Sequence, residues 1–241
     1  MTANAVMLRV CVVEDPEGVA VAAADLLAVA VAARPDLTVG LLTGRTAIPF
    51  YDELAGRHRR GEIDLSRARV FNLDELLLPA AHPASFHSFM ERHAWAWIGL
   101  ERSRCDIPSA TAEPHAECRR YDEALAAAGG LDLVFLGVGV DGHVGYNMPG
   151  APQAGTHLVD LPDALANSLE VPPTWRPLRA ITMGLGTIRD ARRIVLMATG
   201  ERKARAVRAL VDGPEDPDWP CSLLRGHADF HLLLDREAAG L

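Results

Sequence analysis

The stretch GGLDLVFLGVGVDGH, residues 129–143, decides how this chain folds. Its two leading glycines end a helical pattern, and residues 131–138 are apolar or glycine except for Asp132. A short run of this kind predicts a strand buried on both faces, which is typical of a parallel sheet. Polar residues follow this run at once, so the carboxyl end of the predicted strand is a candidate site.

Similar apolar runs alternate with helical patterns along the rest of the chain. The expected strands are Leu8–Val13, Leu37–Leu42, Ala68–Asn72, Leu131–Val138, Arg179–Met183, Arg193–Ala198 and Phe230–Leu234. The expected helices are Pro16–Ala33, Ala47–Arg59, Ser85–Trp97, Glu113–Ala128 and Glu201–Val211. This alternation predicts an α/β fold, a single domain over residues 1–241 with a doubly wound, mostly parallel sheet and helices on both faces. Residues 148–174 stay open as a loop or lid, a disordered segment or a short helix.

The composition narrows the classes of partner. The formal net charge of −8 argues against nucleic acid and anionic membranes as main partners, but it leaves a small anionic substrate open. The four cysteines form no C-x-x-C pair, and Cys11, inside an apolar run, is expected to be a buried core thiol in a reducing cytoplasm. Residues 19–33 include Asp25 and are expected to be too short and too polar to cross a membrane, and no targeting segment is expected.

Glycine, threonine, carboxylate, histidine and lysine residues gather where five of the expected strands end. These strand ends are residues 43–46, 72–75, 137–143, 184–187 and 199–203. Ligands of open parallel sheets bind outside the carboxyl ends of the strands. We therefore expect these five segments to meet around one site.

Two of these strand ends suit an anion. Thr43, Gly44, Arg45 and Thr46 combine hydroxyl groups and a glycine just before a helix whose first N–H groups are free. Lys203 lies in the first turn of another expected helix, where a cation opposes the helix dipole unless an anion binds nearby. The alternatives are a glycine turn with a threonine N-cap and a solvated surface lysine.

Two other strand ends carry groups for proton transfer. Asp74 and Glu75 are adjacent, so one carboxylate can point into a cleft as a general base while the other points away. The alternative for this pair is a helix cap or a loop ion pair. Asp141 lies two residues before His143, a spacing that lets a carboxylate hold one tautomer of the imidazole.

Neither a cofactor nor a metal ion is expected. Gly139 and Gly142 are expected to shape the pocket, but the glycines of their loop lack the G-x-G-x-x-G arrangement of a dinucleotide site. His82, His87 and His93 are not spaced as H-E-x-x-H, and we interpret them as loop and helix-face residues.

In this order, the motifs resemble those of the glucosamine-6-phosphate deaminase/isomerase family, which shares a superfamily with 6-phosphogluconolactonase. The resemblance runs from about Val10 to Leu234. It rests on LTGRT (42–46), FNLDE (71–75), HPASFHSFM (82–90), GVGVDGHVGYNMPG (137–150), ITMGLGTIRDA (181–191) and TGERKA (199–204).

The resemblance implies a Rossmann-like fold and a role for each motif. Asp74 would move a proton between C2 and C1 of the open-chain sugar. His143, oriented by Asp141, would open the sugar ring at O5. Residues 43–46 and Lys203 would bind the substrate phosphate.

Three positions depart from the family pattern. Met148 stands where the deaminases carry a Glu that completes an Asp–His–Glu unit, and a thioether cannot exchange that proton. Leu169 stands where the deaminases carry a phosphate-binding Arg after an A-N-S segment. Arg45 replaces a glycine, and our hypothesis is that its charge restores the one lost at Leu169.

Three functions stay open on this basis. The first is a sugar-phosphate aldose–ketose isomerase, in particular an aminosugar-6-phosphate deaminase that turns glucosamine 6-phosphate into fructose 6-phosphate and ammonia. The second is a 6-phosphogluconolactonase-like hydrolase, because that branch also lacks the Glu at the position of Met148. The third is a non-catalytic sugar-phosphate binder. The expected partner is a small phosphosugar, and a homo-oligomer stays open.

Overall fold

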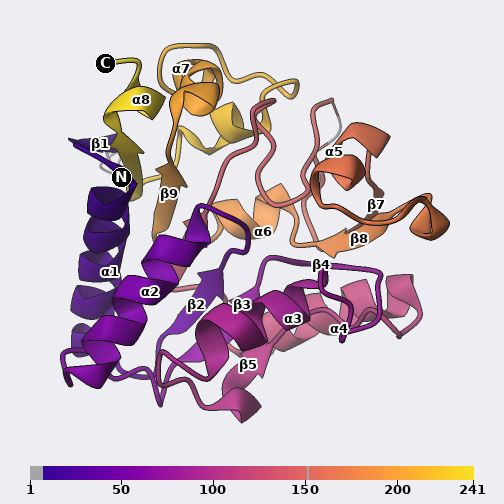
Figure 1. Cartoon of the computed structure of the whole chain (residues 1–241), viewed down its shortest axis with the longest axis horizontal. Helices are drawn as coiled ribbons and strands as arrows, with labels where there is room; N and C mark the ends of the chain where they lie inside the picture. Colours follow the sequence, from indigo (N-terminus) through magenta and orange to yellow (C-terminus); the bar gives the residue numbers. More distant parts are fainter. Residues whose placement is uncertain (1–7, 151) are drawn as a thin grey trace, which may run out of the picture.

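Seven parallel strands form the main sheet of the computed structural model, which describes residues 8–150 and 152–241 (Figure 1). In spatial order they are β1 (Leu8–Val13), β10 (Phe230–Asp235), β9 (Ile194–Ala198), β6 (Leu133–Leu136), β2 (Thr38–Leu41), β3 (Arg69–Asn72) and β5 (Cys105–Asp106). The chain runs outward from β2 to β3 and β5 and then returns to β6 on the other side of β2. The order of the strands therefore reverses between β2 and β6, and doubly wound sheets bind ligands at such a point.

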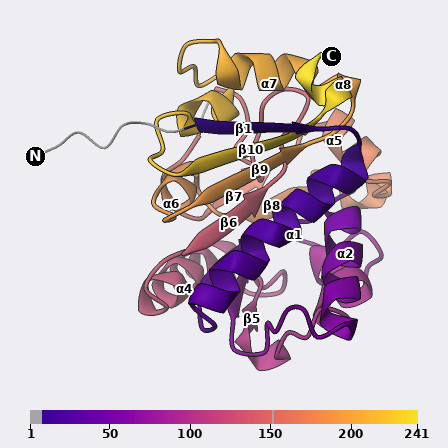
Figure 2. The ribbon, with the colours of Figure 1, turned by 90° about the vertical axis from the view of Figure 1, so that its left-hand side faces the viewer.

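Helices cover both faces of this sheet. The α-helices of the described residues are α1 (Pro16–Ala33), α2 (Ala47–Arg59), α3 (Phe86–Met90), α4 (Pro114–Ala127), α5 (Asp163–Ser168), α6 (Leu185–Arg189), α7 (Ala204–Val211) and α8 (Arg236–Ala239). Right-handed crossovers place α1 and α2 on one face and α4 on the other, as Figure 2 shows. The predicted α/β class with a mostly parallel, doubly wound sheet is confirmed.

The chain continues from β3 into the first strand of a second sheet, which has three antiparallel strands. Its strands, in spatial order, are β4 (Asp74–Leu76), β8 (Arg179–Thr182) and β7 (His157–Asp160). The strand expected at residues 179–183 is present as β8, but it belongs to this second sheet and not to the parallel one. An apolar run predicts a strand but not its partner, and here Thr182 pairs with Asp74 across an antiparallel ladder.

A smaller apolar cluster packs around this second sheet and α5. Its buried members are Leu76, Leu78, Phe86, Tyr146, Leu161, Ala166, Val171, Leu178 and Ala180. Residues 148–174, left open from the sequence, supply β7 and α5 in their described part. This stretch is thus largely built into the fold rather than a simple loop.

Helix α1 begins where the sequence predicts, because the Asp15 carboxylate accepts a hydrogen bond from the Gly18 N–H at 2.8 Å. By length and composition α1 is apolar enough to cross a membrane, so the expectation that it is too short and too polar is wrong. In the fold, one face of α1 packs against the sheet and α2. The buried residues of that face are Val19, Ala20, Ala23, Ala24, Leu27 and Val31.

The side chain of Cys11 is exposed, so the prediction of a buried core thiol is wrong. Cys11 lies on β1, an edge strand that, among the described strands, pairs with β10 alone. Its neighbours Val10 and Val12 are 47% and 42% exposed. An apolar run does not reveal whether both sides of a strand are covered, and at a sheet edge they need not be.

Residues 184–187, expected to contribute a strand end to the site, instead pack tightly against the chain at residues 153–155. The Leu185 N–H donates to the Gln153 carbonyl at 2.7 Å, and the Thr187 N–H donates to the Ala154 carbonyl at 3.0 Å. A Cβ atom on Gly184 would lie 2.2 Å from the Gly155 carbonyl oxygen and 2.3 Å from that of Ala154. Glycine is therefore required at position 184 by close backbone packing.

We expect Gly184→Ala to lower the free energy of unfolding by about 1–3 kcal/mol, because backbone atoms cannot yield to the new methyl group as a side chain would. Urea unfolding followed by circular dichroism measures this change. Gly226→Ala is the matched control, since its Cβ would meet only the Glu215 carboxylate at 3.5 Å. Equal stability of the two variants would contradict the tight packing at Gly184.

Candidate active site

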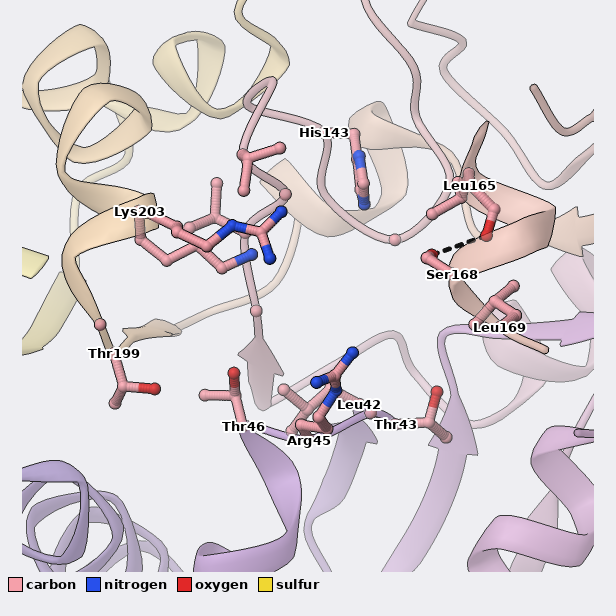
Figure 3. Close-up of a pocket in the computed structure, with 18 of the residues that line it drawn as sticks. Leu42, Thr43, Arg45, Thr46, His143, Leu165, Ser168, Leu169, Thr199 and Lys203 are labelled. Atoms are coloured by element: carbon pink, nitrogen blue, oxygen red, sulfur yellow. Dashed lines mark hydrogen bonds between the residues drawn. The ribbon is translucent and has the colours of Figure 1, made fainter. Parts of the chain in front are cut away.

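A cavity of about 800 Å³ opens at the carboxyl ends of β2, β3, β6 and β9. Four of the five predicted strand ends line it, and residues 184–187 do not, among the described residues. Figure 3 shows Arg45, His143 and Lys203 around this cavity, each on a different element. The lining includes Thr43, Gly44, Arg45, Thr46, Asp74, Gly139, His143, Tyr146, Leu165, Ser168, Leu169, Thr199, Arg202 and Lys203.

The turn between β2 and α2 supplies one wall of the cavity. Gly44 has a φ of +98°, a left-handed conformation that favours glycine. Thr46 precedes α2 but makes no side-chain cap hydrogen bond, so the threonine N-cap alternative is not realised. The hydroxyl group of Thr46 is therefore free toward the cavity, whereas the N–H groups of Ala47 and Ile48 already donate to the carbonyl groups of Gly44 and Arg45.

Lys203 faces this turn from the far side of the cavity (Figure 3). It lies in a short 3-10 turn, Glu201–Lys203, that leads into α7. Burial lowers the pKa of the Lys203 ammonium, and the positive charges of Arg202 and Arg45 lower it further. An ammonium group whose charged form is disfavoured in this way is stabilised when an anion binds beside it.

Asp74 lines the cavity with a side chain that is almost fully buried. Burial raises the pKa of this carboxyl group to about 8, and the neighbouring Glu75 adds to the rise. Its position is fixed by the pairing of β4 with β8, in which Asp74 lies opposite Thr182. A carboxyl group with a pKa near neutrality is suited to exchange protons with a substrate.

Glu75 points away from Asp74, because successive residues of a strand point to opposite faces of the sheet. Its carboxylate accepts hydrogen bonds of 2.7 to 2.8 Å from the N–H groups of Leu76, Phe86 and His87. Burial raises the pKa of Glu75 to about 7, and these three bonds oppose the rise. Glu75 therefore caps the start of α3, while Asp74 alone faces the cavity.

Asp141 and His143 form a hydrogen-bonded pair, with 2.6 Å between Oδ1 and Nδ1. This bond lowers the pKa of Asp141 to about 2, so Asp141 is a carboxylate that accepts the Nδ1 proton and leaves Nε2 free. A Cβ atom on Gly139 would lie 2.2 Å from His143 Nδ1. Gly139 is thus required for this pair to form, and Gly142, with φ of +84°, turns the loop behind it.

Several cavity residues were not identified from the sequence. Tyr146 lines the cavity with its ring stacked on that of Phe86, at 6.0 Å between centroids. The one available signal for Tyr146 was its place in the loop that carries His143. Arg202 also lines the cavity, next to Lys203 in the same turn.

Met148, which we expected in the pocket, packs instead against the smaller apolar cluster. A flexible, apolar thioether is more stable among such side chains than in a polar cavity. Leu169, at the end of α5, does line the cavity, as the family pattern implies for this position. Among the described residues, no three His, Cys, Asp or Glu side chains are grouped so as to hold a metal ion.

Comparison with known proteins identifies the family. The family model described as glucosamine-6-phosphate isomerases/6-phosphogluconolactonase matches residues 15–232. The chain belongs to this family. A glucosamine-6-phosphate deaminase of Halothermothrix orenii is 40% identical over 97% of the chain and 100% of its own length. Another from Streptomyces avermitilis is 38% identical over 96% of the chain and 92% of its own length.

Solved structures of the glucosamine-6-phosphate isomerase/6-phosphogluconolactonase family share the fold. A structure described as a monomeric glucosamine-6-phosphate deaminase superposes with a TM-score of 0.92, at 34% identity over 97% of the chain and 100% of its own. The 6-phosphogluconolactonase of Trypanosoma brucei superposes with a TM-score of 0.78 at 20% identity, covering 98% of the chain and 99% of its own. The second likeness concerns the fold alone.

We expect Asp74→Asn to stabilise the fold increasingly as the pH rises from 5 to 8. The raised pKa means that the folded state disfavours the charged carboxylate, so Asp74 costs stability above its ordinary pKa and the cost levels off near pH 8. The gain has an upper bound of about 6 kcal/mol. Urea unfolding at several pH values measures it.

Asp141→Asn is the control, and it should change the stability of the fold in the opposite direction. The pKa of Asp141 is lowered in the fold, so its carboxylate stabilises the native state above pH 4, and that stability is lost as the pH falls through 2. This variant should therefore be destabilised at neutral pH. If both variants shifted in the same direction, the burial of the Asp74 charge would not be what sets its pKa.

Proposed function

We propose that this chain is a glucosamine-6-phosphate deaminase, which combines its substrate with water to give fructose 6-phosphate and ammonia. The observation that carries this proposal is one buried carboxyl group, Asp74, in the same cavity as the imidazole of His143 and a cationic wall. Relatives named glucosamine-6-phosphate deaminase, 36 to 40% identical over nearly the whole chain, support the substrate.

The substrate phosphate would bind at the cationic wall. The hydroxyl groups of Thr43 and Thr46 and the side chains of Arg45 and Lys203 all face this region. Guanidinium and ammonium groups hold a phosphate dianion by charge-assisted hydrogen bonds. Anchored there, a hexose would extend toward Asp74 and His143.

His143 would open the pyranose ring. Its free Nε2 accepts the proton of the C1 hydroxyl and delivers it to O5 as the C1–O5 bond breaks, which leaves an aldehyde at C1. Asp141 stabilises the imidazolium that exists between these two transfers, because it stays a carboxylate throughout.

Asp74 would then move the proton that defines the isomerisation. Its carboxylate removes the C2 proton, the C1–C2 double bond forms, and the aldehyde oxygen takes a proton that the substrate's own ammonium group gives up, relayed by Nε2 of His143. Asp74 returns its proton to C1 of this enolamine, which leaves an iminium group at C2. Water adds to C2, and ammonia leaves as the C2 ketone forms.

The residue at position 148 affects the rate of these reaction steps. Without a third acid–base group at that position, the His143–Asp141 pair is left to serve ring opening unaided. Loss of one proton-transfer partner lowers a rate by about 10²- to 10⁴-fold. We therefore propose slow turnover compared with relatives that carry the carboxylate.

In D2O, we expect the protein to incorporate deuterium at C1 or C2 of the phosphosugar, at a rate that Asp74→Asn lowers by about 10²-fold or more. NMR of the substrate measures the exchange. The kcat/KM should rise with pH around an apparent pKa near 8, because the base must be deprotonated. Hydrolysis of 6-phosphogluconolactone that survives Asp74→Asn but not His143→Ala would favour the lactonase instead.

We expect Arg45→Ala to raise the KM for glucosamine 6-phosphate by about tenfold or more, because a charged hydrogen bond to phosphate is lost. Adding Leu169→Arg to this variant should recover much of the loss, since position 169 lines the same cavity. Steady-state kinetics measures both effects. Arg189→Ala is the surface control, and an unchanged KM in Arg45→Ala would remove Arg45 from phosphate binding.

A further inference from the structure

A second cavity lies at the opposite end of the main sheet from the active site. It measures about 340 Å³ and is lined by Arg34, Asp36, Thr38, Arg67, Arg69, Arg104 and Ala128. Thr38 and Arg69 begin β2 and β3, and Arg104 immediately precedes β5, so this arginine cavity sits at the amino ends of three neighbouring strands. Residues of the catalytic cavity follow the carboxyl ends of β2 and β3.

The four arginines of this cavity are not equally neutralised. The Arg34 guanidinium lies 2.5 Å from an oxygen of Asp132 and 3.7 Å from one of Asp36. Arg67, Arg69 and Arg104 form no side-chain hydrogen bond or ion pair with any part of the chain that the structure describes. Asp36, which pairs with Arg34, is the carboxylate among the lining residues, and the other three guanidinium groups have no ion-pair partner in the described part of the chain.

The register of the sheet forces two of these charges together. Strands β3 and β5 are parallel, with Val70 beside Cys105 and Phe71 beside Asp106, so Arg69 and Arg104 occupy neighbouring positions one step earlier. Adjacent strands lie about 4.8 Å apart. Like charges at such positions repel and destabilise the sheet, unless an anion lies between them.

The arginine cluster is opposite in sign to the net charge of the chain. With a formal net charge of −8, the surface as a whole repels anions. A local cluster of three unpaired guanidinium groups beside the buried Thr38 runs against that background. Guanidinium groups present paired N–H donors that match the oxygens of a phosphoryl group.

We propose that the arginine cavity is a second anion site, which binds a phosphoryl group, free or carried by a small metabolite. Arg69 and Arg104 hold it from the strand ends, and Arg67 closes over it from the turn before β3. The cavity is large enough for a compact phosphorylated molecule and too polar for an apolar one. This site is separate from the catalytic cavity and does not depend on the proposed deaminase activity.

Isothermal titration at low ionic strength tests the proposal, with inorganic pyrophosphate as the probe. Because the catalytic cavity also attracts anions, the titration uses an Arg45→Gln/Lys203→Gln background in which that cavity has lost two of its cations. We expect one saturable site per chain to remain. Adding Arg69→Gln and Arg104→Gln should weaken it by about tenfold or more.

A charge-matched control separates a defined site from general attraction. Arg189→Gln/Arg208→Gln removes the same two positive charges from exposed helix positions outside both cavities, and binding should not change. Arg69→Lys keeps the charge but loses the paired donors, so it should give an intermediate affinity. Arg69→Lys also tests the site if the Arg69→Gln/Arg104→Gln variant fails to fold.

Three results would overturn the proposal: no saturable binding in the background protein, equal weakening by the control pair, or full affinity in Arg69→Gln/Arg104→Gln. Titrations with inorganic phosphate and with adenosine monophosphate then distinguish the two sources of the phosphoryl group. Tighter binding of the ester than of the free ion identifies a metabolite as the occupant. Tighter binding of the free ion identifies an inorganic anion.

Discussion

The burial of one carboxyl group, Asp74, is the constraint on which the candidate active site depends. In water its proton would be lost near pH 4, but in the cavity the charged form lacks solvent and its pKa rises to about 8. The fold makes this possible through β4, which pairs with β8 and fixes the backbone of Asp74 at the cavity wall. Glu75, the next residue, is turned toward the N–H groups of α3 and does not compete for the same space.

The positive groups of the cavity and its proton-transfer groups come from different structural elements. Positive groups come from the turn after β2 and the turn before α7, while the titratable groups that can exchange protons come from β4 and the loop after β6. A phosphate held by the first set leaves the other end of a hexose near the second. The same separation keeps Lys203 and Arg45 from forming ion pairs with Asp74, which would lower its pKa and weaken it as a base.

Much of the fold and of the cavity could be predicted from the sequence, because both follow from local patterns. The strand at residues 131–138, the N-cap of α1 and the residue types at the strand ends are each visible in a few consecutive residues. Pairings across the chain were not visible in this way. The structure was therefore needed to find the partner of β8, the exposure of Cys11 on an edge strand and the packing of Met148 away from the cavity.

The position of β1 in the sheet limits when this strand can fold. Among the described strands its neighbour in the sheet is β10, at residues 230–235, and β10 is held on its other side by β9. During translation β1 and α1 therefore lack the strand that they pack against until residues 230–235 have emerged. Contacts of such long sequence separation slow folding, and the pairing of β10 with β1 joins residues 8–13 to the rest of the sheet.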